Sequence, residues 1–327
     1  MSKRLRILLD GYIDGNFGDD LMLYLAADGL KEHKLYITSP KLDIAEYTEE
    51  KIGFDCYLKV TGSGFLIHNN KGIAYRMRDM YREKRYSKNR AVINCNISGF
   101  VNRVAGKVIQ KQISDYDFVT VRDRYSYEYI TKNIPNVKCE KYPDMVLSLS
   151  DKMIPNVHSE NALGISVHNS ADINLLAEIA DRFINETGRN VCLLCFNTGL
   201  EDDVSVANQV YGIMKNKHMT EIIRYKDIND MLKNIKRCGA ILGIRFHSAM
   251  LALRMGVPVV PIAYSDKTKN ALDEIGYSGK IYDVNNIDTD EVLRSILNAV
   301  PYKLDNNIIK SAENHIKRFD EYIKRQC

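Results

Sequence analysis

The sequence lacks any long hydrophobic run. No stretch approaches the roughly 18 consecutive apolar residues that a membrane-spanning helix requires. Three of the first six residues, MSKRLR, are charged, and the apolar run that follows them covers only residues 7–9. A signal peptide needs a longer apolar segment, so we expect no signal peptide and a cytoplasmic protein.

The sequence also lacks a strong net charge and an obvious disulfide framework. Lys and Arg exceed Asp and Glu by 46 to 42, a net charge of +4. This gives no reason to expect nucleic-acid binding, although it is compatible with a mildly positive site for an anionic substrate. The seven cysteines are odd in number and scattered, so reduced thiols are expected. Cys192 and Cys195 form a C-x-x-C in an apolar run, which we interpret as a buried strand.

What the chain does contain is an α/β pattern, repeated in two halves. Its 327 residues suggest two domains of roughly 150 residues each. Short apolar runs alternate with amphipathic segments in both halves, which is typical of α/β folds with parallel sheets. We predict an N-terminal Rossmann-like domain over 1–150, a C-terminal one over 160–303, and a long C-terminal helix over 304–327. The polar linker lies at about 150–161 and contains Pro155. Open α/β sheets bind ligands beyond the carboxyl ends of their strands.

The strongest local signal lies between residues 239 and 267. A buried strand at 239–244 is followed by helical spacing at 247–255, and Gly256 ends that helix. Arg245 and His247 therefore fall where a strand ends and a helix begins, a location that favours anions. An arginine offers a fork of donors for carboxylate or phosphate, and a histidine can transfer a proton near neutral pH. Lys267 follows the next strand, so all three basic side chains could converge; the alternative is a set of ordinary structural residues.

Two weaker signals lie in the first half. Arg122 falls at a strand end, where it could bind an anion or form an ion pair with Asp123 or another local acid. Ser126 could cap the following helix. Gly62 and Gly64 fall at another strand end, where the absence of a side chain lets a ligand or loop approach the backbone.

The glycine-rich turn over residues 11–20, GYIDGNFGDD, fits no common nucleotide or calcium motif. No Gly-Lys-Ser/Thr follows, the twelfth position of an EF-hand would be Leu25, and the glycine spacing is not that of a dinucleotide fingerprint. What remains is a strand, a turn and a helix that begins near Asn16, Asp19 and Asp20. Either aspartate could cap the helix, or one of them could accept a proton from a substrate hydroxyl.

Taken together, four motifs resemble the polysaccharide pyruvyl transferase family. They are GYIDGNFGDDLML at 11–23, VRDRYSYEYI at 121–130, YPDMVLSL at 142–149 and GIRFHSAMLALRMGVPVVPIAYSDKTKNALDEIG at 243–276. Two departures are a loop at 61–64 with fewer glycines than usual, and the stretch 66–90, which matches nothing in the family. That stretch is expected to face the acceptor.

The resemblance implies a GT-B-like α/β fold, with two Rossmann-like domains facing a central cleft. It also implies that phosphoenolpyruvate donates its pyruvyl unit to a sugar as a ketal and releases phosphate. The acceptor would be a saccharide or a lipid-linked saccharide, with no metal or cofactor required.

For this reaction we assign hypothetical roles to individual residues. Arg245 would hold the donor's anionic groups, His247 would act as the acid or contact phosphate, and Asp19 would be the base. The substrate-binding residues would be Asn16, Gly62, Gly64, Arg122 and Lys267.

Two alternatives remain at this stage. A glycosyltransferase that uses a nucleotide sugar could share the architecture, although an acid to hold the ribose is missing from residues 248–255. An interaction protein that kept the fold is the second alternative. Separately, residues 76–90 carry seven basic side chains, which indicates either a solvated helix face or a contact with an anionic, lipid-linked acceptor at the inner membrane face.

Overall fold

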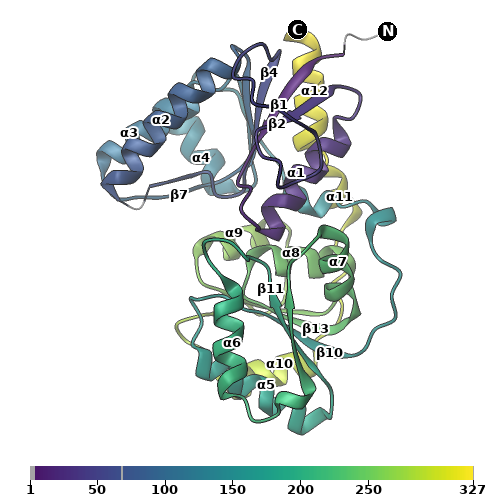
Figure 1. Ribbon diagram of the computed structural model, residues 1–327. Coiled ribbons are helices and arrows are strands. Elements are labelled where there is room, and N and C mark those ends of the chain that lie inside the picture. Colours follow the sequence, from purple (N-terminus) through teal and green to yellow (C-terminus); the bar gives the residue numbers. More distant parts are fainter. Residues whose placement is uncertain (1–3, 68, 327) are drawn as a thin grey trace. The chain divides into compact units, whose positions relative to one another are not determined.

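The computed structural model describes residues 4–67 and 69–326 and divides the chain into two compact units. Unit 1 comprises residues 1–13, 19–148 and 309–327; unit 2 comprises residues 14–18 and 149–308. Each unit is α/β (Figure 1). Within the described chain, no helix combines the length and apolar character needed to cross a membrane.

Unit 1 is built on a parallel sheet. Within its described residues, seven strands pair in the order β3-β2-β1-β4-β6-β8-β9. The strands of this sheet are β1 (Arg6–Asp10), β2 (Lys34–Ile37), β3 (Glu46–Tyr47), β4 (Cys56–Val60), β6 (Arg90–Cys95), β8 (Phe118–Val121) and β9 (Cys139–Lys141). A separate parallel pair joins β5 (Phe65–Ile67) and β7 (Ile97–Phe100). The strand order reverses between β1 and β4, as in Rossmann-like folds.

Helices cover both faces of the unit 1 sheet (Figure 1). They are α1 (Phe17–Gly29), whose first two residues belong to unit 2, α2 (Asn70–Tyr86), α3 (Arg103–Ser114), α4 (Arg124–Asn133) and α12 (Asn314–Gln326). The expected single C-terminal helix is instead two helices, α11 (Asn306–Ala312) and α12, separated at Glu313. The apolar spacing of Ile309, Ala312 and Ile316 continues across the break, so the sequence gives no sign of it.

Unit 2 repeats the same topology. Within its described residues, six parallel strands pair in the order β12-β11-β10-β13-β14-β15. They are β10 (Ala162–Ser166), β11 (Val191–Cys195), β12 (Thr220–Arg224), β13 (Cys238–Gly243), β14 (Val259–Ala263) and β15 (Tyr282–Asp283). The helices are α5 (Ile173–Thr187), α6 (Asp203–Ile213), α7 (Ile228–Arg237), α8 (Phe246–Met255), α9 (Asp266–Glu274) and α10 (Thr289–Leu297). Short 3-10 helices lie at Met145–Ser148, Asp151–Met153 and Lys217–Met219.

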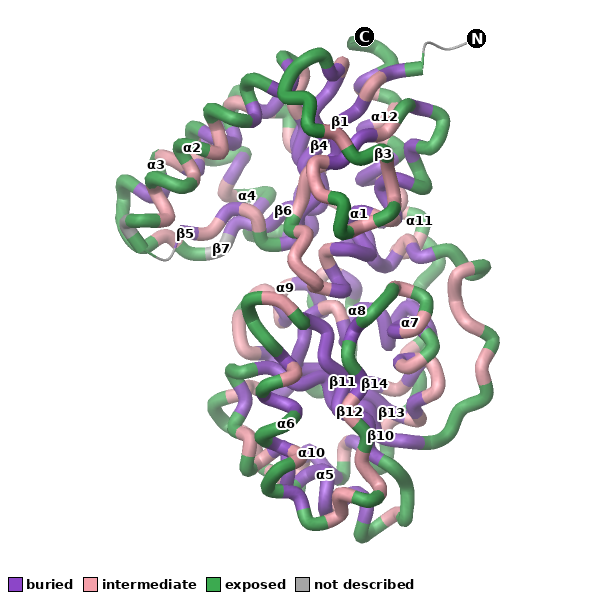
Figure 2. The backbone as a smooth tube through the Cα atoms, viewed as in Figure 1, coloured by how far each residue is buried: buried purple, intermediate pink, exposed green. Residues whose placement is uncertain are grey.

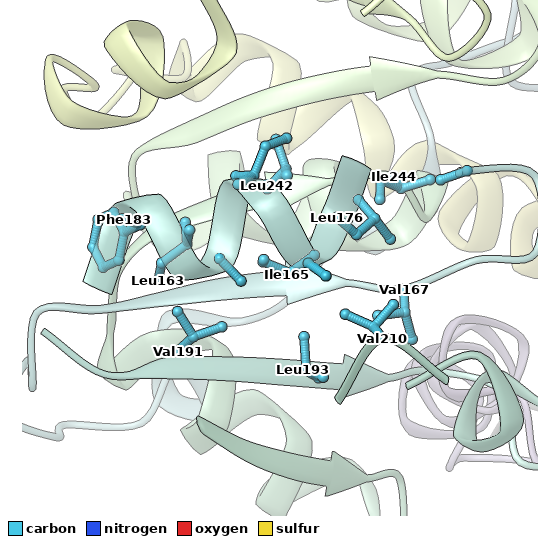
Figure 3. Packing of buried hydrophobic residues seen from close by; sticks show 14 of the residues in the cluster. Leu163, Ile165, Val167, Leu176, Phe183, Val191, Leu193, Val210, Leu242 and Ile244 are labelled. Atoms are coloured by element: carbon cyan, nitrogen blue, oxygen red, sulfur yellow. The ribbon is translucent and has the colours of Figure 1, made fainter. Parts of the chain in front are cut away.

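The core of unit 2 forms between its central strands and α5 (Figure 3). β10, β11 and β14 are buried along their whole length (Figure 2), as expected for strands covered on both faces. Asp172 caps the amino end of α5, and Gly188 ends it in the left-handed conformation at φ 65°. Cys192 and Cys195 lie in β11 and are buried, so the prediction of a core strand for this C-x-x-C is confirmed.

Candidate functional site

The carboxyl ends of β10 and β13 define the candidate site in unit 2. These two strands lie side by side where the strand order reverses, the position at which α/β sheets bind ligands. Arg245 follows β13 and His168 follows β10. α8 begins at Phe246 and ends at Gly256, which is left-handed at φ 65°, so the predicted strand, turn and helix are confirmed.

Two serines fix the backbone of the β13–α8 turn. The Ser166 hydroxyl accepts hydrogen bonds from the N–H groups of Ile244 (2.9 Å) and Arg245 (3.1 Å). The Ser248 hydroxyl donates to the Arg245 carbonyl at 2.6 Å and lies 2.7 Å from the Ser166 hydroxyl. All of these groups are buried, so the backbone that carries the Arg245 side chain has little freedom to move.

The Arg245 guanidinium is held by two carboxylates of the chain itself. Its Nε donates to Asp203 at 3.0 Å, its Nη2 also bonds Asp203, and its Nη1 bonds Glu201. Asp203 is fully buried and also accepts the N–H groups of Phe196 (2.9 Å) and Asn197 (2.8 Å). Burial acts to lower the pKa of Arg245, but Asp203 and Glu201 outweigh it and raise that pKa, so the guanidinium stays charged. Burial raises the pKa of Asp203 despite the opposing effect of Arg245.

Lys267 and His168 act electrostatically on the same carboxylate, that of Glu201. Burial acts to raise the pKa of Glu201, but Arg245, His168 and Lys267 outweigh it and the pKa is lowered. The Lys267 ammonium lies 5.0 Å from the centre of the Phe246 ring, at the start of α8. The structure thus brings Arg245, Lys267 and His168 together from the ends of β13, β14 and β10.

His168 was not identified from the sequence. Its ring stacks on Tyr264, with 4.4 Å between ring centres, and its Nδ1 lies 2.7 Å from the Ser170 hydroxyl. Burial, with the charges of Arg245 and Lys267, lowers the pKa of His168 to about 4, so the imidazole is neutral at pH 7. Its position at the end of the first strand of the second α/β half was the available signal, because that strand borders the point of reversal.

The residues 14–18 of the opening turn belong to unit 2. Asn16 forms an antiparallel bridge with Asn197. The Phe17 N–H donates to the Phe196 carbonyl at 2.9 Å, and the Thr198 N–H donates to the Gly15 carbonyl at 2.9 Å. This segment therefore pairs with the loop that leads to Asp203.

The start of α1 differs from the prediction that an aspartate caps it. The helix begins at Phe17, and the Asn16 side chain accepts the Gly18 N–H at 3.1 Å. Asp19 and Asp20 lie inside the first turn, where their charges complement the helix dipole. Asn16 is therefore the residue that holds the turn.

His247 packs against the opening turn. A Cβ atom on Gly18 would overlap the imidazole of His247, so only glycine fits at this position. The His247 ring also lies edge-on to Phe246, with 5.0 Å between ring centres. Asn16, Gly18, His247, Arg245 and Lys267 thus belong to one unit.

Asp19, the candidate base, lies in unit 1, partly buried in the first turn of α1. Its role stays a prediction.

Arg122, predicted from the first half to bind substrate, lies in a buried ion pair in unit 1. The Arg122 guanidinium bonds Asp144 at 2.5 Å, and both side chains are 1% exposed. A Cβ on Gly62 would come within 2.8 Å of Arg122 Nη1, so the close approach at Gly62 is made by this side chain. The ion pair left open by the sequence is present, with Asp144 rather than Asp123, and a donor-binding role for Arg122 stays a prediction.

Other details of this region also differ from or add to the expectation. Asp123, not Ser126, caps α4, because its carboxylate accepts the Ser126 N–H at 2.8 Å. Gly64 faces the Thr61 side chain, and nothing in the structure tests its assignment to substrate binding.

The basic segment at 76–90 contains most of α2. Tyr75, Met77 and Tyr81 are exposed on this helix, between 58% and 68%. Glu83 points inward, where it accepts hydrogen bonds from Lys59 (2.7 Å) and Tyr116 (2.9 Å). The outer face of α2 therefore combines aromatic and basic side chains.

The fold is of the GT-B-like α/β class, and comparisons with solved structures agree. UDP-GlcNAc 2-epimerase from Methanocaldococcus jannaschii has a TM-score of 0.63 at 12% identity, covering 98% of this chain and 100% of that one. The epimerase from Neisseria meningitidis bound to UDP-GlcNAc has a TM-score of 0.59 at 11% identity, with 97% and 100% coverage. UGT73P12 of Glycyrrhiza uralensis has a TM-score of 0.55 at 9% identity, with 99% and 96% coverage. At such low identity these similarities concern the fold alone.

The sequence profile described as "Polysaccharide pyruvyl transferase" matches residues 16–266, and the chain belongs to this family of transferases. The match begins at Asn16 and ends at Asp266, so it includes most of the site of unit 2. No curated protein matches the chain significantly by sequence.

Proposed function

We propose that this transferase moves the pyruvyl unit of phosphoenolpyruvate onto a sugar of a cell-surface or exopolysaccharide precursor. The product is a ketal, and inorganic phosphate is released. The observation that carries the proposal is an arrangement of three basic side chains at the ends of three strands: Arg245 bonds the Glu201 carboxylate, Lys267 lies over the Phe246 ring, and His168 stacks on Tyr264. A donor with a carboxylate and a phosphate needs such a site.

The reaction requires one proton to reach the donor's methylene carbon. This makes C2 electrophilic, and a first sugar hydroxyl adds to it. The C2–O bond to phosphate then breaks, and a second hydroxyl of the same acceptor closes the ketal. Of the two hydroxyl protons, one balances the proton gained by the methyl group and the other leaves with phosphate.

The chain's own residues can support these steps. Arg245 and Lys267 hold the anionic groups, and the neutral imidazole of His168 is a hydrogen-bond partner at pH 7. His247 is proposed as the proton donor or a phosphate contact, held in place by the close fit to Gly18. Asp19 is proposed as the base that receives a hydroxyl proton.

The acceptor is proposed to be a saccharide or a lipid-linked saccharide. The exposed Tyr75, Met77 and Tyr81 of α2, together with its arginines, suit a peripheral contact with an anionic membrane face. The cytoplasmic side of the membrane would be the place of this contact.

The test is the thermal stability of the full chain with millimolar phosphoenolpyruvate and, separately, with a panel of nucleotide sugars. Ligand at about 100 times its Kd adds about 2.7 kcal/mol to the free energy of unfolding, enough to raise the midpoint visibly. A shift with phosphoenolpyruvate alone supports the proposal. A shift with a nucleotide sugar alone would overturn the donor and point to a glycosyl donor instead.

A further inference from the structure

We propose that Glu201 is an internal competitor for the donor's anionic group, which must displace its carboxylate from Arg245. This inference rests on the proposed function, since it describes how the same site selects its substrate. Asp203 occupies Nε and Nη2 of the guanidinium, and Glu201 bonds the remaining nitrogen, Nη1.

The two carboxylates on Arg245 are held very differently. The Asp203 side chain is 0% exposed and is fixed by hydrogen bonds from Arg245, Phe196 and Asn197. The Glu201 side chain is 50% exposed, bonds Arg245, and accepts a hydrogen bond from the Asn197 amide at 3.4 Å. Asp203 is thus a permanent part of the site, whereas Glu201 can be exchanged for a ligand from solvent.

The place of the Glu201 carboxylate is one that a substrate anion would also prefer. Arg245 bonds it through Nη1, and Lys267 also acts on it electrostatically. A carboxylate or phosphate group placed there meets the same donors. Glu201 therefore marks the position of an anion subsite.

The exchange requires little movement of the backbone. The loop around Glu201 is held by the Gly199 N–H, which donates to Asn197 Oδ1 at 2.8 Å, and by the Asp202 N–H, which donates to the Gly199 carbonyl at 3.1 Å. Asp202 also caps α6 through the Ser205 N–H. Rotation of the Glu201 side chain alone is enough to release Nη1.

Such a competitor favours ligands that carry a full negative charge at this position. A neutral group cannot replace a carboxylate on a guanidinium without leaving a charge poorly paired. A group with a full negative charge restores the pairing as it displaces Glu201. The subsite therefore selects substrates that carry a phosphate or carboxylate at this position.

The experiment is calorimetric titration of the full-length chain, as wild type, Glu201→Gln and Glu221→Gln. Each is titrated with phosphoenolpyruvate and, separately, with inorganic phosphate. Glu221 is the matched control. Its side chain is also 50% exposed and also pairs with an arginine, Arg237, but Glu221 lies on β12 and not beside Arg245. We expect Glu201→Gln to bind both anions about two- to fivefold more tightly, the range for one half-exposed ion pair, and Glu221→Gln to match wild type.

Equal or weaker binding by Glu201→Gln would overturn the inference, because Glu201 would then be neutral or supportive. An equal gain in Glu221→Gln would also overturn it, since the effect would be one of net charge. Suppose that none of the three proteins binds phosphoenolpyruvate but Glu201→Gln binds phosphate more tightly than wild type does. Glu201 is then still a competitor for anions, and phosphoenolpyruvate is rejected as the donor. Glu201→Ala, judged by the same titrations, replaces Glu201→Gln if the latter does not fold.

Discussion

The imidazole of His247 lies against the backbone of Gly18, so closely that a methyl group at position 18 would occupy the place of the ring. Gly18→Ala should therefore displace His247. A shift of about 1 Å at a reacting group can cost about a hundredfold in rate. We expect kcat for phosphate release from phosphoenolpyruvate and an acceptor to fall by about this factor, measured in steady-state assays.

Gly212→Ala is the control for this substitution. Gly212 lies in α6, and nothing lies within 4 Å of a Cβ added there. This variant should keep the wild-type kcat. A Gly18→Ala enzyme with normal kcat would show that His247 does not take part in the reaction.

Lys267→Ala should weaken donor binding. Loss of a hydrogen bond to a charged group costs about 1.5–3 kcal/mol, or about ten- to hundredfold in Kd. Lys269→Ala is the matched control, because Lys269 lies two residues away on α9 and pairs with Asp283 at 2.8 Å. Titration with phosphoenolpyruvate should show the loss in Lys267→Ala and little change in Lys269→Ala; equal affinities would remove Lys267 from the donor site.

Asp203→Asn should destabilise unit 2. It removes one charge of a buried pair and leaves Arg245 poorly compensated, which typically costs about 3–5 kcal/mol. The change is measured as the midpoint of urea unfolding. Asp290→Asn breaks the exposed pair with Arg182 and should cost less than about 1 kcal/mol. Similar midpoints for the two variants would contradict the structural importance given to Asp203.

His315 should make the stability of the chain depend on pH. It is fully buried between the Thr120 hydroxyl (2.6 Å) and the Pro143 carbonyl (2.9 Å), and burial lowers its pKa to about 4. The unfolded chain, with a histidine pKa near 6.5, then binds the proton more readily. The contribution is complete above about pH 6.5 and is lost as the pH falls toward 4, by about 2 kcal/mol at pH 5.

The measurement is the free energy of unfolding in urea at pH 7 and pH 5 for wild type and His315→Gln. The variant should be less stable at pH 7 but should lose less on acidification. His158 is exposed, so His158→Gln should keep the wild-type dependence. An unchanged dependence in His315→Gln would assign the acid sensitivity to other groups.

The local features of the site could be predicted from the sequence because they depend on near neighbours. The strand before Arg245, the helix after it and its end at Gly256 all follow from apolar spacing and from a glycine in the left-handed region. The same holds for the alternation of strands and helices in both units, and hence for the fold class.

The partners of Arg245 could not be predicted in this way. Asp203, at the start of α6, and Glu201, in the loop before it, lie 42 and 44 positions away, and their approach to Arg245 depends on tertiary packing. His168 belongs to none of the motifs and is marked only by its place after the first strand of the second half, and the pairing of Gly15 with Thr198 spans 183 positions. An isolated acid and an isolated histidine look the same in a sequence whether they serve a site or a surface.

The break at Glu313 could not be predicted because the local pattern there is misleading. The apolar spacing on either side of it is continuous, so the local pattern predicts a longer helix than the one that forms. Helix ends depend on caps and on packing, which spacing does not report.

Because residues 14–18 belong to unit 2, the C-terminal half of the chain cannot be separated cleanly from the N-terminal half. The chain changes units on either side of this five-residue segment, and the Phe17 ring, 0% exposed, packs 5.2 Å from Phe196 and 5.4 Å from Tyr225. A gene fragment that encodes residues 149–308 would lack Phe17, and the rings of Phe196 and Tyr225 would then lose this contact and be exposed to water. Residues 149–308 are therefore not a self-sufficient domain. A chimera that exchanges them between relatives must also exchange residues 14–18.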